Sequence, residues 1–566
     1  MCKLTDYNVE RWTLYKKLFE EVLIEGYTPP YQKGGKGSSV QEVNKRLPQY
    51  DINHHIKALY NWIESQEKRV KKGLVNYLPD WTLYAGPVST TKPTKVVKSK
   101  TRKWILTAAQ NETRVHEGFW NNLVAYAKHL DAQIMVAPFT YGLALFTDHA
   151  TRDNVFSEII RPYLQYEQVN CGSVVFCAEM NTLPTAVRPL SGLHSYTRGR
   201  TGIFPHAKLA LESVPSMHGI YPPVIMTTGC CTIENYIQKK AGLKAAFHHI
   251  IGSVIVEEDV FGNTFCRHIN ATDDGDFQDL DCVVRDEKVT TGQRVEAITW
   301  GDIHCRKLDF TAAKASFGFD TDEWRTTSND SLLDFLKPRY QFFHDVFDGE
   351  SRNPYNEKNA HENFRLFINN KESIEEEVSD VASFLRSTER EWCKSVVDES
   401  NHDLWLAKWL NTADYRRDPI NALFYLRIQL ASYEAQARGD DTFSVFKHAL
   451  KSADGLKLAG IDFCPLNGSY NICQDSGGIE CGFHGHLGPN GSRASANSLV
   501  KIASKLNIGH SHSAGIYDGV YQSGVLGKLF MNYNNGPSSW THSNIITYPN
   551  GKRSIITLQG GRYFAR

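Results

Sequence analysis

Apolar side chains recur at helical spacing over residues 1–75, and this pattern predicts a small helical domain. The stretch VERWTLYKKLFEEVLIEGY predicts one helix, and after the loop TPPYQKGGKG a second periodic segment begins at Ser38 and Ser39, two candidate N-caps. From there we expect a short helix to Leu47, a break at PQYD and a longer helix. The longer helix would carry His54, Lys57, Trp62 and Lys68.

Two helices joined by a tight break are typical of a helix-turn-helix, whose second helix can enter the DNA major groove. A small helical bundle that only packs or oligomerises fits the same pattern equally well. Residues 76–103 then predict a basic linker, because TTKPTKVVKSKTRK holds six Lys or Arg residues and no acid. Such a run is usually solvated, although beside a DNA-binding helix pair it would also contact phosphates.

An accessory α/β domain is predicted over residues 104–290, because short apolar runs alternate there with helical or loop segments. The runs are WILTAA, AQIMVAPF, SVVFCAE, PPVIMTTG and GSVIVEE. The remainder, about 259–290, is loop-rich and acidic. No phosphate loop or dinucleotide fingerprint occurs in this region, so nucleotide binding of those kinds is not expected.

Residues 291–566 predict a further α/β domain. The apolar strand VEAITW ends on GDIHCRKLDF, and a charged helical region forms an insert over about 351–450. In the tail SNIITYPNGKRSIITLQGGRYF, a Pro-Asn-Gly turn separates two β-rich runs and predicts a hairpin. The predicted fold class is therefore α/β, preceded by the small helical domain.

Composition places the chain among ordinary globular proteins. At 566 residues it is long enough for about three or four units. Lys and Arg equal Asp and Glu at 63 each, so no global field attracts the protein to nucleic acid, and any such attraction must be local. No run of 18 apolar residues and no secretion signal is present, which predicts a cytoplasmic protein without a membrane segment. The 12 cysteines are scattered, which favours buried, reduced thiols.

Candidate metal ligands gather in five short motifs of the last half. GDIH places Asp302 and His304 two apart at a strand end, so both side chains point the same way. HDVFDG supplies Asp345 and Asp348, and a carboxylate is able to bridge two cations because it has two oxygens. The other motifs are SNHD, with Asn401, His402 and Asp403; FHGH, with His484 and His486; and GHSH, with His510 and His512.

These residue types suit a metal site with proton-transfer chemistry. An Asn carbonyl ligates a hard cation, while the His beside it can stay unligated and transfer protons, oriented by a neighbouring acid. One such motif alone is more often a surface or satisfied polar group than a ligand. Five in one order, each after a predicted strand or helix, indicate a common site.

The five motifs resemble those of the calcineurin-like metallophosphoesterase superfamily, which run Asp-x-His, Gly-Asp-x-x-Asp, Gly-Asn-His-Asp/Glu, a later His and Gly-His-x-His. The resemblance covers roughly residues 290–566 and implies a β-sandwich flanked by helices that holds two metal ions. It implies that the ligands of one metal are Asp302, His304 and His512. It implies that those of the other are Asn401, His484 and His510, with Asp345 bridging the two.

The same resemblance implies that His402 transfers a proton or stabilises the leaving group, and that Asp403 holds His402. Two positions depart from the superfamily pattern, since His344 and Ser400 stand where glycine is usual. Neither departure removes a ligand, but the choice between Asp345 and Asp348 stays open. His486 likewise stays an alternative to His484.

The donor set favours a particular class of metal and reaction. Carboxylate, amide and imidazole donors without thiolate suit Mn²⁺ best, with Fe or Zn²⁺ as alternatives and Mg²⁺ less suitable. Two such ions activate a bridging water for in-line attack on phosphorus. A structural Zn²⁺ site closes with four ligands, whereas this set offers seven. We therefore expect a phosphoester hydrolase.

The region before residue 291 favours DNA as the substrate, because a small-molecule phosphatase would need neither a helix pair nor a basic linker. The whole layout, including the start MCKLTDYN, is also similar to the early host-DNA-degradation proteins of T-five-like bacteriophages. This resemblance implies a DNase in the bacterial cytoplasm that forms a homo-oligomer. Two alternatives remain: a phosphatase or phosphodiesterase acting on nucleotides or phosphoproteins, and a DNA-binding or assembly protein with a structural metal.

Overall fold

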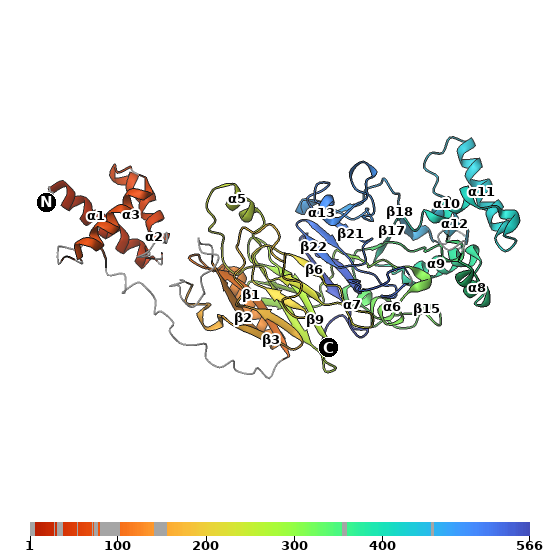
Figure 1. Ribbon diagram of the computed structural model, residues 1–566, viewed down its shortest axis with the longest axis horizontal. Helices are drawn as coiled ribbons and strands as arrows, with labels where there is room; N and C mark the ends of the chain where they lie inside the picture. Colours follow the sequence, from red (N-terminus) through yellow and green to blue (C-terminus); the bar gives the residue numbers. More distant parts are fainter. Residues whose placement is uncertain are drawn as a thin grey trace.

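The structure is a computed structural model, shown in Figure 1, that describes most of the chain. The described residues are 6–25, 27, 29–30, 38–53, 55–70, 72, 77–79, 102–140, 156–353, 359–453, 458–531 and 533–565. Within them the protein is a mixed α/β fold with several sheets. No helix of the described residues is long and apolar enough to cross a membrane.

The N-terminal helices form as the apolar pattern predicts. They are α1 (Asp6–Ile24), α2 (Ser38–Arg46) and α3 (Ile56–Val70), with a 3₁₀ turn at Leu47–Tyr50 between the last two. Pro48 begins this turn and Asp51, in a left-handed conformation, ends it, so the break at PQYD is confirmed. Trp62 is buried against Tyr15 and Phe19, whereas Lys57 and Lys68 are exposed. His54 and most of the predicted basic linker lie outside the described residues.

A four-stranded sheet opens the accessory region. Its order is β2 (Gln133–Phe139), β1 (Lys103–Gln110), β8 (Gly252–Glu258) and β9 (Thr264–Asn270). Helix α4 (Glu117–Leu130) connects β1 to β2, which pair in parallel. The apolar runs WILTAA, AQIMVAPF and GSVIVEE form these strands as predicted, because both faces of the sheet are buried.

The largest sheet has ten strands and spans two predicted domains. Its order is β19 (Asn471–Ile472), β20 (Ile479–Glu480), β21 (Leu506–Ile508), β23 (Val520–Gln522), β22 (Gly515–Tyr517), β6 (Leu211–Ser213), β7 (Val224–Thr227), β5 (Gly202–Phe204), β4 (Val174–Cys177) and β3 (Gln168–Cys171). Strands β22 and β6 pair antiparallel, with Ile516 opposite Leu211. Residues before and after position 290 therefore share one sheet.

A six-stranded sheet carries the predicted C-terminal hairpin. Its order is β18 (Ile461–Cys464), β17 (Lys394–Asp398), β16 (Tyr340–Phe343), β13 (Ala297–Thr299), β24 (Ser543–Thr547) and β25 (Arg553–Thr557). Its first four strands run parallel, and β24 and β25 form the hairpin around Pro549 and Gly551. The Asn507 amide of β21 donates to Thr299 and Thr547 hydroxyls, so this sheet faces the ten-stranded one.

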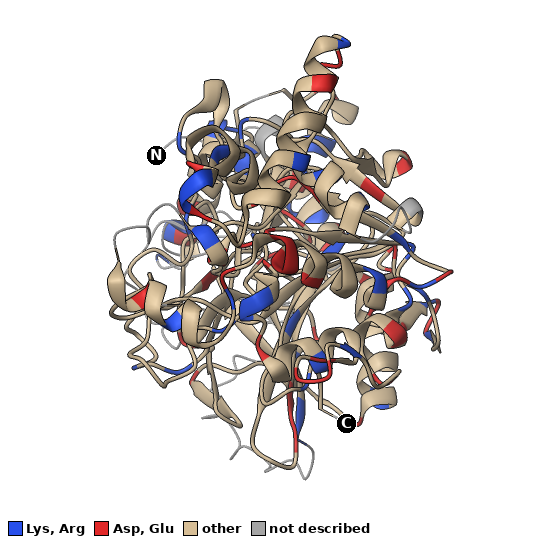
Figure 2. Ribbon diagram, turned by 90° about the vertical axis from the view of Figure 1, so that its right-hand side faces the viewer, with Lys and Arg blue, Asp and Glu red and all other residues tan. Residues whose placement is uncertain are grey.

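Helices cover the outer face of the six-stranded sheet and extend into the predicted insert (Figure 1). They are α6 (Phe310–Phe317), α7 (Leu332–Leu336), α8 (Ala360–Ile368), α9 (Ile374–Thr388), α10 (Trp405–Thr412), α11 (Ala422–Ala437) and α12 (Val445–Ala453). Lys and Arg are interspersed with Asp and Glu on the side that Figure 2 turns toward the viewer. The assignment of this sandwich to the calcineurin-like fold, and the exact domain boundaries, stay predictions.

Candidate metal centre

Strand direction explains why residues from distant motifs meet. Strands β13, β16 and β17 are parallel neighbours, so the loops that follow them leave the same edge of the six-stranded sheet. Those loops hold GDIH, HDVFDG and SNHD. Strands β20 and β21 of the facing sheet are also parallel and are followed by FHGH and GHSH. All five predicted motifs therefore come together between the sheets.

Four of the predicted ligands form a compact, buried group. Their ligand atoms all lie within 4.8 Å of one another, a spacing that could hold a metal ion. The Nε2 atom of His304 lies 3.0 Å from Nε2 of His512 and 3.8 Å from Oδ2 of Asp345. The Nε2 atom of His512 lies 3.2 Å from Oδ2 of Asp302.

The backbone at this group adopts conformations that non-glycine residues rarely take. The φ angles are 46° at His304, 46° at Asp345, 75° at His510 and 59° at His512. Left-handed backbone at such residues costs free energy and clusters at functional sites. The first residue of GHSH, Gly509, has to be glycine for a steric reason, because a Cβ atom there would collide with the Asp302 carboxylate.

Residues predicted to bind a second metal also lie close to Asp345. The Nε2 atom of His484 is 3.4 Å from Asp345 Oδ2, and the rings of His484 and His510 are 5.2 Å apart. The His486 ring lies 5.4 Å from that of His484, so both rings border the same space and the choice between them as ligand stays open. The amide oxygen of Asn401 is buried without a hydrogen-bond partner.

Unpartnered polar atoms show that these residues fit a metal. Buried polar atoms in proteins are nearly always hydrogen-bonded, because an unpaired one costs free energy. Here both oxygens of Asp345, one oxygen of Asp302 and both ring nitrogens of His484 have no hydrogen-bond partner. Cations bound among these atoms would accept their unused lone pairs. The donor set contains no thiolate, as expected for Mn²⁺ and similar ions.

The local electrostatics favour the protonation states that ligate metals. Burial lowers the pKa of His512 to about 3 and that of His510 to about 4, so both rings are neutral at pH 7. A neutral imidazole has the free lone pair that a metal needs. Burial works against ionisation of Asp345, but His484 and His402 outweigh it and hold the Asp345 pKa well below its usual value.

His402 lies at the rim of the cluster as a cation. Burial opposes its charge, but the carboxylates of Asp345 and Asp348 outweigh burial and raise the His402 pKa to about 9. Its Nδ1 atom lies 3.2 Å from Oδ1 of Asp348. Asp348 also accepts from His304 and pairs with Lys307. The acid in contact with His402 is therefore Asp348.

The carboxylate of Asp403 turns away from His402. It accepts hydrogen bonds from the backbone amides of Phe347 and Ser400 and from the Ser400 hydroxyl. Asp403 thus closes the SNHD loop and joins it to the HDVFDG loop, instead of making the expected contact with His402. Ser400, one of the two departures from the superfamily pattern, supplies two of these bonds.

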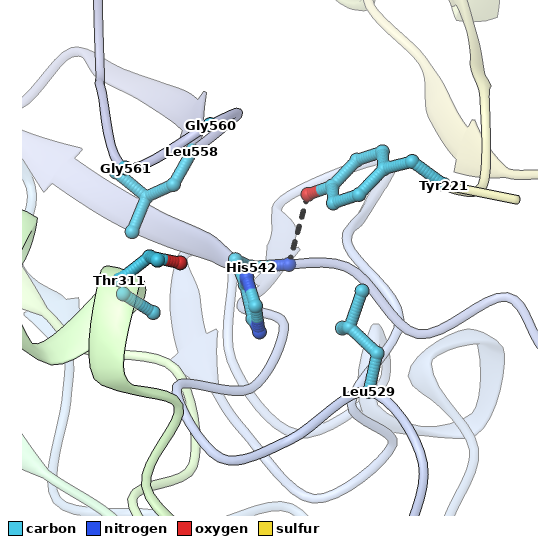
Figure 3. Close-up of a pocket in the computed structure, with 8 residues that line it drawn as sticks. Tyr221, Thr311, Leu529, His542, Leu558, Gly560 and Gly561 are labelled. Atoms are coloured by element: carbon cyan, nitrogen blue, oxygen red, sulfur yellow. Dashed lines mark hydrogen bonds between the residues drawn. The ribbon is translucent and has the colours of Figure 1, made fainter. Parts of the chain in front are cut away.

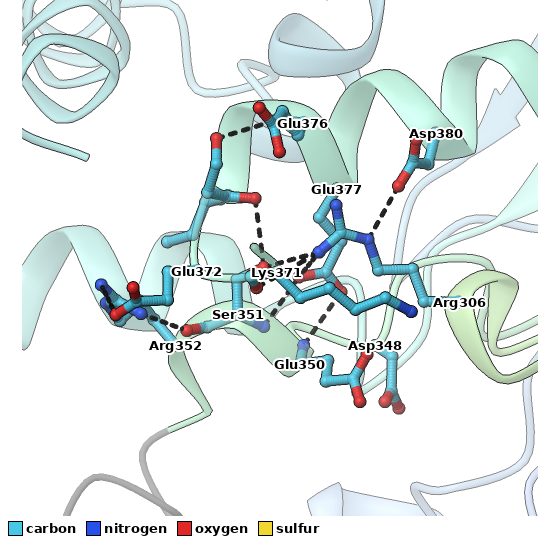
Figure 4. Close-up of polar contacts among 12 residues, drawn as sticks. Arg306, Asp348, Glu350, Ser351, Arg352, Lys371, Glu372, Glu376, Glu377 and Asp380 are labelled. Carbon is cyan, nitrogen blue, oxygen red and sulfur yellow. Dashed lines mark hydrogen bonds and ion pairs between the residues drawn. The ribbon is translucent and has the colours of Figure 1, made fainter. Parts of the chain in front are cut away.

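A polar network behind the cluster holds the loops against α9 (Figure 4). The Glu377 carboxylate accepts from the backbone amides of Glu350 and Ser351, each at 2.9 Å. Arg306 donates to Asp380 at 2.8 Å and to the Ser351 hydroxyl at 2.9 Å. Because Arg306 follows His304 by two residues and Glu350 follows Asp348 by two, this network positions both metal-facing loops.

The sequence motifs did not include His344 and Asp398 as functional residues. Both are buried, with 3.7 Å between His344 Nε2 and Asp398 Oδ2, and neither side chain has a hydrogen-bond partner. The His344 ring also lies 5.4 Å from that of His484. The sequence signal for this pair was His344 itself, which stands where the superfamily usually has glycine. That departure does not predict which residues lie next to His344 in the fold.

A phage protein is closely similar to the chain along nearly its whole length. Protein A1 of Escherichia phage T5 is 37% identical over 532 residues, which cover 91% of this chain and 93% of that protein. The chain belongs to the protein A1 family. The relationship to phages that the overall layout predicted is thereby confirmed. No family model matches the chain, and for this member of the A1 family the calcineurin-like assignment rests on the motifs.

Proposed function

We propose that this A1-family protein is a metal-dependent phosphodiesterase that cuts DNA. The observation that carries the proposal is the position of Asp345. Neither carboxylate oxygen has a hydrogen-bond partner, and Oδ2 lies 3.8 Å from Nε2 of His304 in one predicted ligand set and 3.4 Å from Nε2 of His484 in the other. One carboxylate between two sets of nitrogen donors suits a pair of divalent ions, most favourably Mn²⁺.

Each residue of the cluster has a role in this proposal. When bound, the two ions would supply a hydroxide nucleophile at neutral pH and neutralise the phosphate charge. Asp302, His304 and His512 would hold one ion, Asn401, His484 and His510 the other, and Asp345 both. Cationic His402 would donate its proton to the leaving oxygen, and Asp348 would orient the His402 ring.

The proposed substrate rests on the N-terminal region and on the phage relationship. The described helices α2 and α3 are joined by a tight break, as in a helix-turn-helix, and the relative is a phage protein. The protein would degrade host DNA in the bacterial cytoplasm early in infection. Hydrolysis of nucleotides or phosphoproteins, or a structural metal in a DNA-binding protein, are the competing functions.

The direct test is incubation of the purified protein with linear and with covalently closed plasmid DNA, in Mn²⁺, in Mg²⁺ and in EDTA. We expect both DNAs to be degraded in Mn²⁺, more slowly in Mg²⁺, and not in EDTA. Hydrolysis of bis(p-nitrophenyl) phosphate without cleavage of either DNA would point to the nucleotide or phosphoprotein function. Binding of DNA without any hydrolysis would point to the structural role.

Self-association is the second part of the proposal, and α11 is the surface that supports it. Two sides of this helix are apolar. Its buried side holds Phe424, Ile428 and Ala435, and its exposed side holds Leu423, Leu426, Leu430 and Tyr433. The exposed residues follow a spacing of three, four and three, which is that of a seam between two packed helices. The same seam on a second copy is its natural partner.

We expect the Leu426→Asp, Leu430→Asp double variant to be of lower mass than the wild type in light scattering coupled to size exclusion, because two charges would be buried in the seam. Gln436→Asp, which adds a charge to the same helix at an exposed position beyond the seam, is the matched control. An unchanged mass for the double variant, or a wild type that is monomeric, would contradict this surface.

A further inference from the structure

Exposed apolar side chains gather where the segment between β23 and β24 meets the loop between β6 and β7. Tyr533 and Phe530 belong to the segment between β23 and β24, and Met217 and Ile220 belong to the loop between β6 and β7. Their exposed fractions are 52%, 41%, 65% and 61%. Aromatic and apolar groups left in water beside a polar site are candidates for ligand contact.

One further ring of the same segment, that of the half-buried Trp540, lies directly against a predicted ligand. The Trp540 ring is 4.1 Å from the His512 ring, centroid to centroid, at 75°. Tyr533 follows at 5.6 Å from Trp540, and the Lys307 ammonium lies 5.6 Å from the Tyr533 ring centroid. The Tyr533 hydroxyl donates to the Met531 sulfur at 3.2 Å.

The C-terminal part of the segment that carries these rings is fixed to the accessory region. Ser216 and Ser538 exchange backbone hydrogen bonds of 2.9 Å, and the His542 amide donates to the Tyr221 hydroxyl at 3.1 Å. Figure 3 shows this second contact beside a cavity of about 150 Å³ that Leu529 and Thr311 also line. The segment therefore joins the accessory region to the C-terminal half, and these two contacts hold the chain on either side of Trp540.

We propose that Tyr533 and Trp540 form a stacking platform for an unpaired nucleobase, next to the phosphate that the metal cluster would hold. The platform rests on the proposed nuclease function and narrows the cleavage point to one where the base is unpaired, either in a single strand or flipped out of a duplex. A base inside a duplex is stacked on its neighbours and cannot offer its face to a protein ring unless it is flipped out. A base stacked on an aromatic side chain contributes about 1–3 kcal/mol to binding.

The test measures binding in EDTA, so that no DNA is cut. Fluorescent single-stranded oligonucleotides, an abasic strand of the same length and a duplex are titrated with wild type, Tyr533→Ala and Trp540→Phe proteins. We expect wild type to bind the base-bearing strand about tenfold more tightly than the abasic strand, and Tyr533→Ala to lose most of this difference. Trp540→Phe, which keeps a ring against His512, should retain most of it.

Phe247→Ala is the matched control, because it removes an exposed aromatic ring from α5 (Lys240–Phe247) and should change nothing. Equal binding of base-bearing and abasic strands by the wild type would overturn the platform. So would a Tyr533→Ala variant that binds both as the wild type does, even if the wild type degrades DNA in Mn²⁺. Base-dependent binding at Tyr533 without any cleavage would instead uphold the platform and reject the nuclease function.

Discussion

The Asp345→Asn protein is expected to lose phosphodiester hydrolysis by about three orders of magnitude or more, together with binding of one or both metal ions. Metal ions stabilise a phosphoryl transition state by several kcal/mol, and each 1.4 kcal/mol is a factor of ten in rate. Asp345 lies between the two sets of nitrogen donors, so its negative charge acts on both. Removing that charge weakens both sites at once.

Asparagine is the informative substitution because it keeps the shape of Asp345 and tolerates the left-handed backbone found there, where φ is 46°. Mn²⁺ binding is measured by calorimetry, and hydrolysis with plasmid DNA and with bis(p-nitrophenyl) phosphate. Asp322→Asn, at an exposed position, is the control for a lost surface charge. Full hydrolysis by an Asp345→Asn protein that still binds as many ions as the wild type would reject the bridging role.

Local patterns predicted most elements of the fold but not how distant parts join. The run GSVIVEE became β8, and the Pro-Asn-Gly turn became the β24–β25 hairpin, because neighbours along the chain determine both. The pairing of Ile516 with Leu211 joins segments about 300 residues apart, and no local periodicity records it. This is why two regions that look like separate α/β units share a sheet.

In the candidate site, too, residues within a motif could be predicted from the sequence, whereas contacts between different loops could not. The resemblance carried by the five motifs implied Asp302, His304, Asp345 and His512 as ligands, and the fold brings these four within one cluster. The resemblance was not sufficient for the partner of His402. Asp403 is adjacent in sequence, but its carboxylate closes its own loop, whereas Asp348 reaches His402 from another loop. Likewise, Tyr533 and Trp540 belong to no motif.

His402→Asn is expected to reduce DNA cleavage by about 10²–10⁴-fold while metal binding is kept. The His402 ring contacts Asp348 and is not among the seven predicted ligands, although His304, Asp348 and His402 lie close enough together to hold an ion themselves. Its loss should therefore remove a proton donor and leave the ligands in place. DNA cleavage and Mn²⁺ stoichiometry are measured on the same preparation, and loss of a bound ion would show that His402 is a ligand instead.

Two substrates with different leaving groups distinguish proton donation by His402 from a merely structural role. The sugar oxygen that leaves in DNA cleavage is strongly basic and needs a proton, whereas p-nitrophenolate is stable as an anion. The His402→Asn protein should therefore hydrolyse bis(p-nitrophenyl) phosphate with a much smaller loss than it shows on DNA. A loss of equal size on both substrates would mean that His402 supports the site without transferring a proton.

The same comparison decides which acid serves His402. Asp348→Asn removes the carboxylate that contacts the His402 ring, so it should reproduce the larger loss on DNA than on the p-nitrophenyl ester. Asp403→Asn replaces one of the two oxygens that accept from Phe347 and Ser400 with an NH2 group and so weakens the closed loop, which should lower stability and affect both substrates alike. If the two variants exchanged these behaviours, Asp403 would orient His402 in the working protein, and the superfamily assignment of that role would hold.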